Sequence, residues 1–441
     1  MPIPAAKGRQ ILVGARIWRK FLNPFTTVSV NLTLLAIVVS ICQNELALPC
    51  GARLKNRIAK SAMSENMANS QNCPDEKFEK LYKTWANGGA GLVMTGNVMI
   101  DASALGETNN VVIEKGHECL EALSAWAKAG TANNTHLWMQ INHPGKQSPR
   151  NLSRVPVAPS AVGYSGSLGR LFNKPRELTE GEIVELIERF GTTARIAKEA
   201  GFTGVQIHGA HGYLVSQFLS PNHNVRTDKW GGSFENRLRF ISEVYKNIRH
   251  KVGPAFPVGI KINSADFQKG GFSEEDSIKT ALHLSQLGID LLEISGGTYE
   301  NPKMMGAVKS KSAVEREAYF LEYCKKIRSV VTTPLLLTGG FRTPAGIEAA
   351  LNSGACDIVG LARVLALNPY FPNEIFVGKA PANQVHQLTT GIKFLDKLVP
   401  LEIVWYTEQL HRMGRGEAPK AHASVRLSAL KFLGGFTWGF S

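Results

Sequence analysis

The chain of 441 residues has 44% hydrophobic and 20% charged residues, the composition of a globular protein. This length fits one large α/β domain or two smaller ones, and the composition excludes an intrinsically disordered chain. The formal net charge of +14 favours acidic partners such as phosphorylated small molecules, nucleic acid or anionic lipid. Beyond the N-terminus the basic residues are dispersed among acidic ones, so we expect a solvated surface and no nucleic-acid partner.

The N-terminal extension, residues 1–45, differs from the rest of the chain. Basic residues crowd its start, no acidic residue precedes Glu45, and the apolar run 25–42 follows. That run is near the lower length limit of a membrane span. Four interpretations stay open: a membrane anchor through residues 25–42, a secretory signal, a mitochondrial transit peptide, or a poorly structured extension. The rest of the chain is expected in the cytoplasm.

Short apolar runs alternate with amphipathic stretches from about Arg57 onward. Eight runs have the composition of strands buried on both faces: residues 58–63, 91–95, 136–141, 204–208, 257–262, 289–294, 334–338 and 357–361. Strands separated by helices form a parallel sheet, and eight of them predict a (β/α)8 TIM barrel. A doubly wound sheet is the alternative, but no GxGxxG motif follows the first strand.

Two of the intervening stretches carry clear helix boundaries. The stretch "LTEGEIVELIERFGTTARIAKEAG" begins with a capping box of Thr179 and Glu182 and ends at Gly201. In "FSEEDSIKTALHLSQLG", Ser273 is the N-cap and Gly288 ends the helix. The Pro/Gly-rich region 150–175 is expected to be a long loop, and "TGIKFLDKLVPLEIVWYTEQLHRMG" a C-terminal helical extension. We therefore expect one barrel domain over residues 46–415 and a C-terminal tail over 416–441.

The cysteines are widely spaced and form no CxxC pair. They show no Cys/His cluster with the spacing of a zinc or iron–sulfur site, so no metal site is predicted. We expect a reducing compartment and thiols that mostly fill the core: Cys42, Cys50, Cys73, Cys119, Cys324 and Cys356.

Polar residues follow the predicted strands at their carboxyl ends, where the active site of a barrel enzyme lies. The stretch "IHGAHGYLVSQFLSP" places His208, His211 and Tyr213 directly after the apolar run 204–207. Three proton-bearing side chains at this spacing can meet one small ligand. On their own they also fit buried core histidines or half of a metal site.

Several stretches together resemble the Old Yellow Enzyme family of FMN-dependent NAD(P)H:flavin oxidoreductases. The resemblance extends from about Leu46 into the C-terminal helix, and its most specific part is 208–240. It is carried by "NRIAKSAMSE", "MQINHPGKQ", "IHGAHGYLVSQFLSPNHNVRTDKWGGSFENRLRF", "KINSADF", "TGGFRTP" and "GLARVLALNP". The resemblance implies a TIM barrel with bound FMN and NADH or NADPH as reductant.

The family's cofactor-binding positions are matched residue by residue. Its FMN phosphate is held by backbone amides and an arginine, which match Gly339, Gly340, Ala362 and Arg363. Backbone N–H groups with one guanidinium form a suitable anion site. The commoner Gly-Arg of the family is Ala-Arg here.

Further positions match those around the flavin ring. Gln140 matches the residue that pairs with the pyrimidine edge, and Lys261 matches a cation, often arginine, that stabilises negative charge near flavin N1. A helix cap is the alternative role for the serine among the positions that line the ring: Ala62, Met63, Ser64 and Gly96.

The resemblance also gives the stretch with the two histidines and the tyrosine a chemical role. His208 and His211 match donors of hydrogen bonds to the electron-withdrawing oxygen of an oxidising substrate, and Tyr213 matches the proton donor. An electron-poor alkene (enone) then receives hydride from flavin N5 and a proton from Tyr213. A quinone, a nitro compound or oxygen are further acceptors that suit a reduced flavin.

Other functions fit parts of the sequence. A dihydrouridine-synthase-like flavin enzyme would act on RNA, and a Schiff-base lyase would use Lys261 as nucleophile. A non-catalytic, membrane-tethered flavin carrier is suggested only by the N-terminal extension. The tail "SVRLSALKFLGGFTWGFS" is apolar and basic enough to cover a second subunit or touch a membrane. Arg226, Asp228 and the "ENR" at 235–237 are expected to be structural, in an ion-pair-rich loop.

Overall fold

The computed structural model describes residues 41–166, 168–298, 300 and 317–435. The basic N-terminal residues and the apolar run up to residue 40 therefore lie outside the described residues. Among the residues that are described, no helix is both long and apolar enough to cross a membrane.

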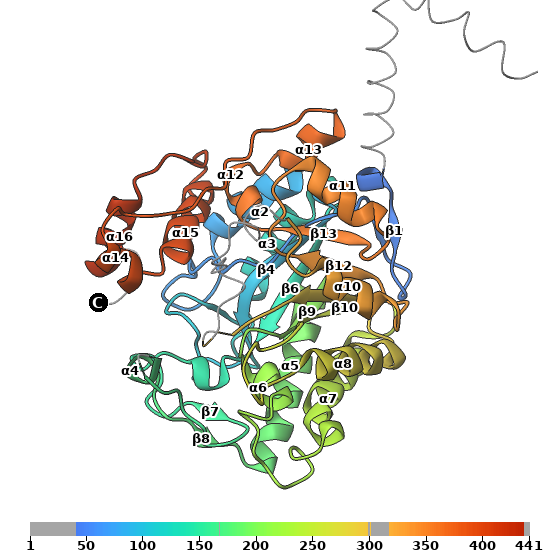
Figure 1. Cartoon of the computed structure of the whole chain (residues 1–441), viewed down its shortest axis with the longest axis vertical. Helices are drawn as coiled ribbons and strands as arrows, with labels where there is room; N and C mark the ends of the chain where they lie inside the picture. The colour runs from blue at the N-terminus through green and yellow to red at the C-terminus, as the bar shows by residue number, and fades with distance from the viewer. Residues whose placement is uncertain (1–40, 167, 299, 301–316, 436–441) are drawn as a thin grey trace, which may run out of the picture.

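Eight parallel strands form a closed barrel (Figure 1). The first strand pairs with both the last strand and the second, which closes the sheet, and the short β5 (Val111–Val112) pairs in parallel with the end of β4. All eight predicted strands are present, and the predicted TIM barrel is confirmed. They are β3 (Ile58–Lys60), β4 (Leu92–Met99), β6 (His136–Asn142), β9 (Gly204–Gly209), β10 (Val258–Asn263), β11 (Leu291–Ser295), β12 (Leu335–Thr338) and β13 (Ile358–Leu361).

Helices follow the strands and surround the barrel. Those of the barrel wall are α2 (Glu76–Asn87), α3 (Leu120–Gly130), α5 (Glu180–Glu199), α7 (Phe234–Val252), α8 (Glu274–Leu287), α10 (Leu321–Arg328) and α11 (Pro344–Asn352). The capping box of Thr179 and Glu182 on α5 is present, and Ser273 caps α8. Gly288 ends α8 with φ +89°, a conformation that glycine adopts without strain.

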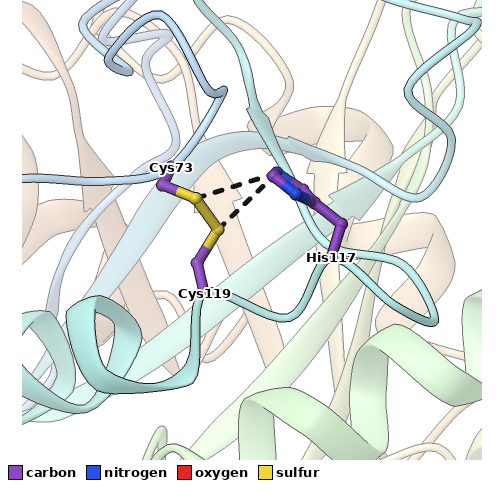
Figure 2. A group of neighbouring side chains, drawn as sticks. All are labelled: Cys73, His117 and Cys119. Atoms are coloured by element: carbon purple, nitrogen blue, oxygen red, sulfur yellow. Dashed lines mark hydrogen bonds between the residues drawn. A yellow bond between two sulfur atoms is a disulfide. The ribbon is translucent and has the colours of Figure 1, made fainter.

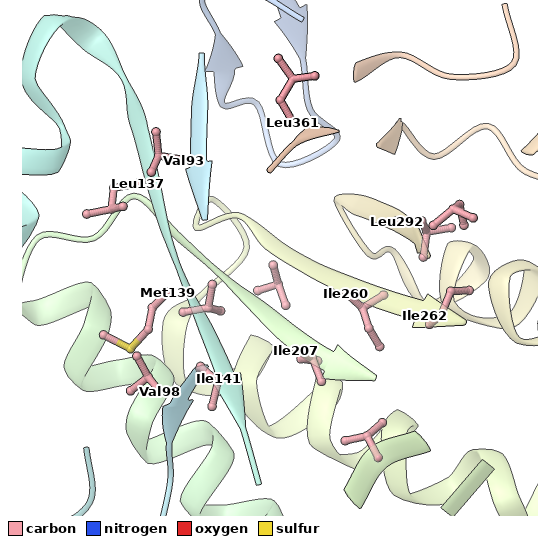
Figure 3. Packing of buried hydrophobic residues seen from close by; sticks show 14 of the residues in the cluster. Val93, Val98, Leu137, Met139, Ile141, Ile207, Ile260, Ile262, Leu292 and Leu361 are labelled. Atoms are coloured by element: carbon pink, nitrogen blue, oxygen red, sulfur yellow. The ribbon is translucent and has the colours of Figure 1, made fainter. Parts of the chain in front are cut away.

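Outward-facing strand residues pack against the helices. Figure 3 shows this core between sheet and helices, where Val93, Leu137, Ile207, Ile260 and Leu292 are fully buried. Each alternates along its strand with residues that face the barrel interior, as the period of two requires. Burial on both faces explains the continuous apolar runs of the sequence.

The amino-terminal end of the barrel interior is apolar. Trp138 fills it, and a Cβ on Gly204 or Gly259 would lie 2.5 or 2.8 Å from atoms of the Trp138 ring. The hairpin of β1 (Leu46–Ala47) and β2 (Arg53–Leu54) contributes Leu48 and Leu54 to the same cluster. This layer, which we call the floor, closes the barrel against water.

The long loop after β6 contains short elements rather than none. Strands β7 (Val157–Ala158) and β8 (Arg176–Glu177) pair in parallel, and the helical turn α4 (Leu168–Leu171) lies between them. The Pro/Gly content of region 150–175 predicts irregular structure throughout. The structure differs at β7, whose backbone pairs with that of β8.

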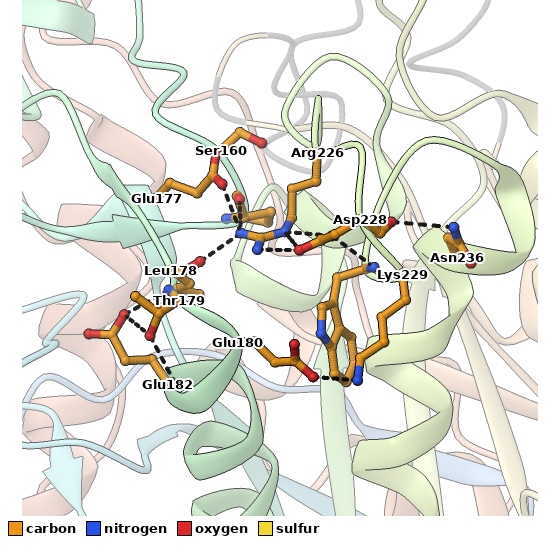
Figure 4. A network of polar contacts seen from close by, with 12 residues as sticks. Ser160, Glu177, Leu178, Thr179, Glu180, Glu182, Arg226, Asp228, Lys229 and Asn236 are labelled. Atoms are coloured by element: carbon orange, nitrogen blue, oxygen red, sulfur yellow. Dashed lines mark hydrogen bonds and ion pairs between the residues drawn. The ribbon is translucent and has the colours of Figure 1, made fainter.

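The predicted ion-pair-rich loop is confirmed in the segment between α6 (Leu214–Leu219) and α7 (Figure 4). Arg226 is buried, lies 2.6 Å from Asp228 and donates to the backbone oxygens of Pro159 and Leu178 at 2.9 and 2.6 Å. Arg237 pairs with Asp276 at 3.0 Å. These arginines bind the loop to the region before α5 and to α8, which is a structural role.

Five helices follow the last strand in the described part of the chain, and one of them, α15, lines the barrel mouth. They are α12 (Arg363–Leu367), α13 (Phe371–Phe376), α14 (Lys393–Leu398), α15 (Leu401–Gly414) and α16 (Val425–Leu433). The single helix expected over 390–414 is interrupted, because Pro400 cannot continue the backbone hydrogen bonds of α14. Figure 1 shows α14, α15 and α16 together, drawn in red.

The expectation of thiols is wrong for two of the six cysteines. Cys73 and Cys119 form a disulfide, and His117 lies beside both sulfurs. The two cysteines are 46 residues apart in sequence, so their spacing gave no indication that they are close. They meet because two loops contact each other outside the barrel. The prediction of core thiols is confirmed for Cys42, Cys324 and Cys356, which are buried.

Candidate active site

A cavity of about 300 Å³ opens at the carboxyl end of the barrel strands. Every predicted site residue except Gly96 lines it. The strand ends contribute polar groups, whereas α15 and the segments around residues 319–320 and 339–342 contribute the rest of the wall. The topology therefore brings together residues that are 342 positions apart in sequence, Ser64 and Tyr406.

The end of β9 and the turn after it place the two histidines. The rings of His208 and His211 are 5.1 Å apart, and that of His208 is 4.7 Å from Tyr213. His211 adopts φ +61°, and its backbone N–H donates to Asn263 Oδ1 at 3.1 Å. This left-handed residue followed by Gly212, at φ +80°, makes the tight turn that returns Tyr213 to the cavity.

The two histidines differ in how their ring nitrogens are satisfied. His211 Nε2 is 2.8 Å from Ser295 Oγ. His208 Nδ1 is buried and has no hydrogen-bond partner among the described residues. A buried polar atom without a partner costs free energy, so His208 is suited to a ligand that supplies one.

Burial keeps both imidazoles neutral. Burial and the nearby Lys261 ammonium lower the pKa of His211 to about 3. Burial is also the largest cause that lowers the pKa of His208 well below its ordinary value, and the neighbouring His211 and Lys261 lower it further. At neutral pH each ring therefore carries one N–H and can donate one hydrogen bond without carrying charge.

Tyr213 lies next to an amide at the end of β4. Asn97 Nδ2 donates a long hydrogen bond, 3.5 Å, to the Tyr213 hydroxyl oxygen. Asn97 Oδ1 is buried without a partner among the described residues. A donor to the phenol oxygen stabilises the negative charge that appears there when the phenol gives up its proton.

A layer of polar side chains crosses the barrel beneath the cavity, and we call it the polar layer. Gln140 Nε2 donates to Gln206 Oε1 at 2.7 Å, and Gln206 Nε2 donates to Glu293 Oε2 at 2.7 Å. Glu293 Oε1 pairs with Lys261 Nζ at 3.0 Å and accepts from Thr338 Oγ1 at 2.7 Å. Glu293 therefore fixes both Gln140 and Lys261, each of which reaches the cavity.

The phosphate-site residues meet at the ends of β12 and β13. Gly339 and Gly340 have φ of +138° and +88°, and a Cβ on Gly340 would lie 3.0 Å from the Tyr319 ring. Such a turn requires glycine. Arg363 Nη1 pairs with Glu402 of α15 at 3.1 Å, so the C-terminal helix holds the one guanidinium predicted here.

Gly96 lies behind the cavity rather than on its surface. Its backbone N–H donates to Glu65 Oε1 at 2.7 Å, and a Cβ there would lie 2.1 Å from Glu65 Oε2. Ser64 donates a hydrogen bond to Glu107 Oε2 and caps no helix, since the N-cap of α2 is Asp75. Burial raises the pKa of Glu107.

Sequence reasoning missed several residues of this site. Gln206 and Glu293 are polar residues inside otherwise apolar runs, a signal that was present in "GVQIHG" and "LLEIS". Asn97 follows a predicted strand and carried a weaker signal. Nothing in the sequence pattern placed the α15 residues at the cavity: Glu402, Ile403, Tyr406, Thr407 and Leu410.

Residues 50–380 match the NADH:flavin oxidoreductase / NADH oxidase family. Among curated proteins, the chain is 39% identical over 351 residues to NADH-dependent flavin oxidoreductase iliE of Neonectria sp. (strain DH2), covering 74% of this chain but only 46% of that relative. It is 35% identical over 404 residues to NADH-dependent flavin oxidoreductase iccE of Talaromyces variabilis, covering 84% of this chain and 97% of the relative.

Solved structures share the same fold. The Old Yellow Enzyme homologue of Zymomonas mobilis superposes with a TM-score of 0.65 at 26% identity, covering 79% of this chain and 98% of that one. The match of the family over most of the barrel selects an oxidoreductase among the functions that the sequence left open. The chain therefore belongs to the NADH:flavin oxidoreductase / NADH oxidase family, to which Old Yellow Enzyme homologues belong, and is an NAD(P)H-dependent flavin oxidoreductase.

Proposed function

We propose that the flavin is FMN, bound at the barrel mouth, and that the enzyme reduces the alkene of an enone or a similar electron-poor acceptor. The donor set fits FMN. Gly339, Gly340, Ala362 and Arg363 offer backbone and guanidinium groups for one phosphate, and Gln140 offers an amide to the pyrimidine edge. The domain that carries this function is residues 46–415, since α15 lines the cavity.

Bound FMN would supply two-electron chemistry, accepting hydride from a nicotinamide and passing hydride to the acceptor. Lys261 would place its positive charge near the bound ring, and the ion pair with Glu293 keeps its ammonium in place. A preorganised cation stabilises the negative charge of a reduced ring without reorganisation. Because Glu293 also anchors Gln140 through Gln206, one carboxylate orients both groups.

The proposed binding site of the acceptor depends on the neutral side chains of His208 and His211. They lie side by side on the cavity wall, and His208 Nδ1 is buried without a partner among the described residues. Two uncharged N–H donors can bind one carbonyl oxygen and draw electrons from the conjugated alkene. The β-carbon of the enone then becomes the hydride acceptor.

Tyr213 donates the proton to the α-carbon. Its ring contacts that of His208, so a carbonyl bound to the histidines lies beside its hydroxyl. Asn97 stabilises the phenolate that remains, through its hydrogen bond to the phenol oxygen. Acid catalysis by a positioned group is worth about 10²–10⁴-fold.

The full-length protein with added FMN tests this proposal. We expect a yellow protein that bleaches anaerobically with NADH or NADPH and regains its colour with 2-cyclohexenone. His208→Ala/His211→Ala should retain the flavin but bind a phenol or enone about 100-fold more weakly, because two hydrogen bonds of about 1–1.5 kcal/mol each are lost. His422→Ala, at an exposed position, is the control.

Two outcomes would contradict the proposal. A folded protein that stays colourless with excess FMN would exclude the cofactor site. Unchanged enone turnover by the double histidine variant would exclude the acceptor site while leaving the cofactor site intact. Parallel assays with a quinone and a nitro compound distinguish the acceptor classes.

A further inference from the structure

A cluster of two sulfurs and one imidazole lies outside the cavity, between two loops. Cys73 belongs to the segment between β3 and α2, and His117 and Cys119 belong to the segment between β5 and α3. Figure 2 shows the three side chains pointing toward one another, with the two cysteines joined as a disulfide. All three are partly exposed, so solutes can reach them.

The distances within this cluster suit a metal ion. His117 Nε2 lies 3.7 Å from Cys73 Sγ and 3.6 Å from Cys119 Sγ. A tetrahedral zinc ion with bonds of about 2.3 Å to sulfur and about 2.0–2.1 Å to nitrogen separates these ligand atoms by about 3.6 Å. The imidazole is therefore already placed at the ligand spacing from both sulfurs.

We propose that Cys73, His117 and Cys119 bind one Zn²⁺ ion when the disulfide is reduced. A thiol or phosphine reductant supplies two electrons, and with two protons from solvent the S–S bond is replaced by two thiols. Zinc then displaces both thiol protons to solvent and binds two thiolates and the neutral imidazole. Water takes the fourth position, since three protein ligands leave one corner of the tetrahedron open.

Hydrogen bonds hold the backbone of the segments that carry the ligands. The Cα atoms of Cys73 and Cys119 are 5.9 Å apart, so the sulfurs can separate to thiolate spacing by side-chain rotation. Asn69 Oδ1 accepts from the Cys73 backbone N–H at 3.1 Å, and Glu114 exchanges two backbone hydrogen bonds with His117 at 3.0 and 3.3 Å. Ligands on a held backbone lose little entropy on binding.

The site joins the two loops that flank the predicted ring-binding residues. The segment after β3 carries Ser64, and the segment between β4 and α3 carries Glu107, to which Ser64 is hydrogen-bonded. Asn72 Nδ2 donates to the Asn110 oxygen at 2.9 Å across the same junction. Zinc and the disulfide are alternative covalent links at one place, and they exclude each other because both use the same two sulfurs.

The test measures bound metal on the full-length flavoprotein. The protein is reduced with a phosphine under nitrogen, exposed to Zn²⁺, desalted and analysed for zinc per chain. We expect about one ion per chain in the reduced protein and none above background in the oxidised protein. Cys73→Ser, Cys119→Ser and His117→Gln should each lose this ion, whereas Cys50→Ser, at a free cysteine outside the cluster, should retain it.

Cobalt provides a second readout of the ligands. In the reduced protein, Co²⁺ should give the intense visible bands of tetrahedral coordination and the near-ultraviolet bands of thiolate ligation. His117→Gln keeps both cysteines and the disulfide, so it folds as the parent does and isolates the imidazole. If reduced wild-type protein retains no more zinc than His117→Gln, or shows no thiolate–cobalt bands, the pair forms a disulfide only and the proposal is overturned.

Discussion

The two layers of the barrel interior, the floor and the polar layer, are built by the same strands only two residues apart. Trp138 of the floor is followed by Gln140, Gly259 by Lys261, and Leu291 by Glu293. Because side chains alternate, a step of two residues along a strand moves one layer along the barrel axis. The floor consists of apolar side chains that exclude water. The side chains of the polar layer are joined to one another by hydrogen bonds and one ion pair.

The two layers therefore have different roles along the barrel axis. The floor stabilises the fold, and the polar layer positions groups of the active site. A buried ion pair adds little net stability compared with apolar packing, so the polar layer is better explained by the groups it presents to the cavity. Substitutions in the floor should therefore change unfolding, and substitutions above the polar layer should change catalysis.

The largest effect is expected at the mouth. Tyr213→Phe removes the proton donor and should lower enone reduction by about 10²–10⁴-fold. The anaerobic bleaching of flavin by NADH should keep its rate, because that step needs no proton from Tyr213. Stopped-flow measurement of the two half-reactions separates them, and an equal loss in both would assign Tyr213 to the ring rather than to the acceptor.

The floor should respond with the opposite pattern. Trp138→Ala leaves a cavity and should reduce the free energy of unfolding by about 3–5 kcal/mol. Turnover per bound flavin should stay the same, since Trp138 lies one layer below the residues of the cavity. Urea unfolding together with turnover of the flavin-loaded fraction checks this, and a large loss of turnover per flavin would show that the layers are coupled.

Glu293→Gln tests the polar layer itself. The amide keeps an oxygen near Lys261 Nζ but removes the charge, and the loss of a charged hydrogen bond should cost about 1.5–3 kcal/mol of stability. The uncompensated ammonium should also raise the reduction potential of bound flavin, because it favours the more negative form. Ser61→Ala, which removes only a contact with Thr338, is the control for packing and should leave the potential unchanged.

The effect that is smallest at neutral pH concerns acid stability. The pKa of His211 falls from 6.5 to about 3 on folding, so the unfolded chain binds more protons between these values. Its contribution is complete above pH 6.5 and is lost as the pH falls toward 3, at about 1.4 kcal/mol per pH unit. His211→Asn tolerates the positive φ and should flatten the dependence of urea midpoints on pH, whereas His422→Asn should not.

Local signals predicted the fold well because each element carries its own boundaries. Thr179 and Ser273 mark helix starts, and continuous apolar runs mark strands, so eight strands and their order needed no long-range information. The same holds for His208, His211 and Tyr213, which one turn brings together. The resemblance to a family then assigned roles that residue chemistry alone left open.

Contacts made by distant segments could not be predicted in the same way. Cys73 meets His117 and Cys119 only because the loops after two neighbouring strands touch, and no spacing rule encodes that. Glu402 reaches Arg363 because Pro400 ends one helix and starts another over the barrel mouth. Glu293 was concealed by its apolar neighbours, although an acidic residue inside a buried strand already requires a partner.

The position of α15 has a consequence for biosynthesis. Its first residue comes 40 residues after the last barrel strand, yet Glu402 holds Arg363 and its neighbours line the cavity wall. A nascent chain released or stalled just after β13 therefore has all its strands but an unfinished pocket. Flavin loading should follow translation of this helix rather than accompany closure of the barrel.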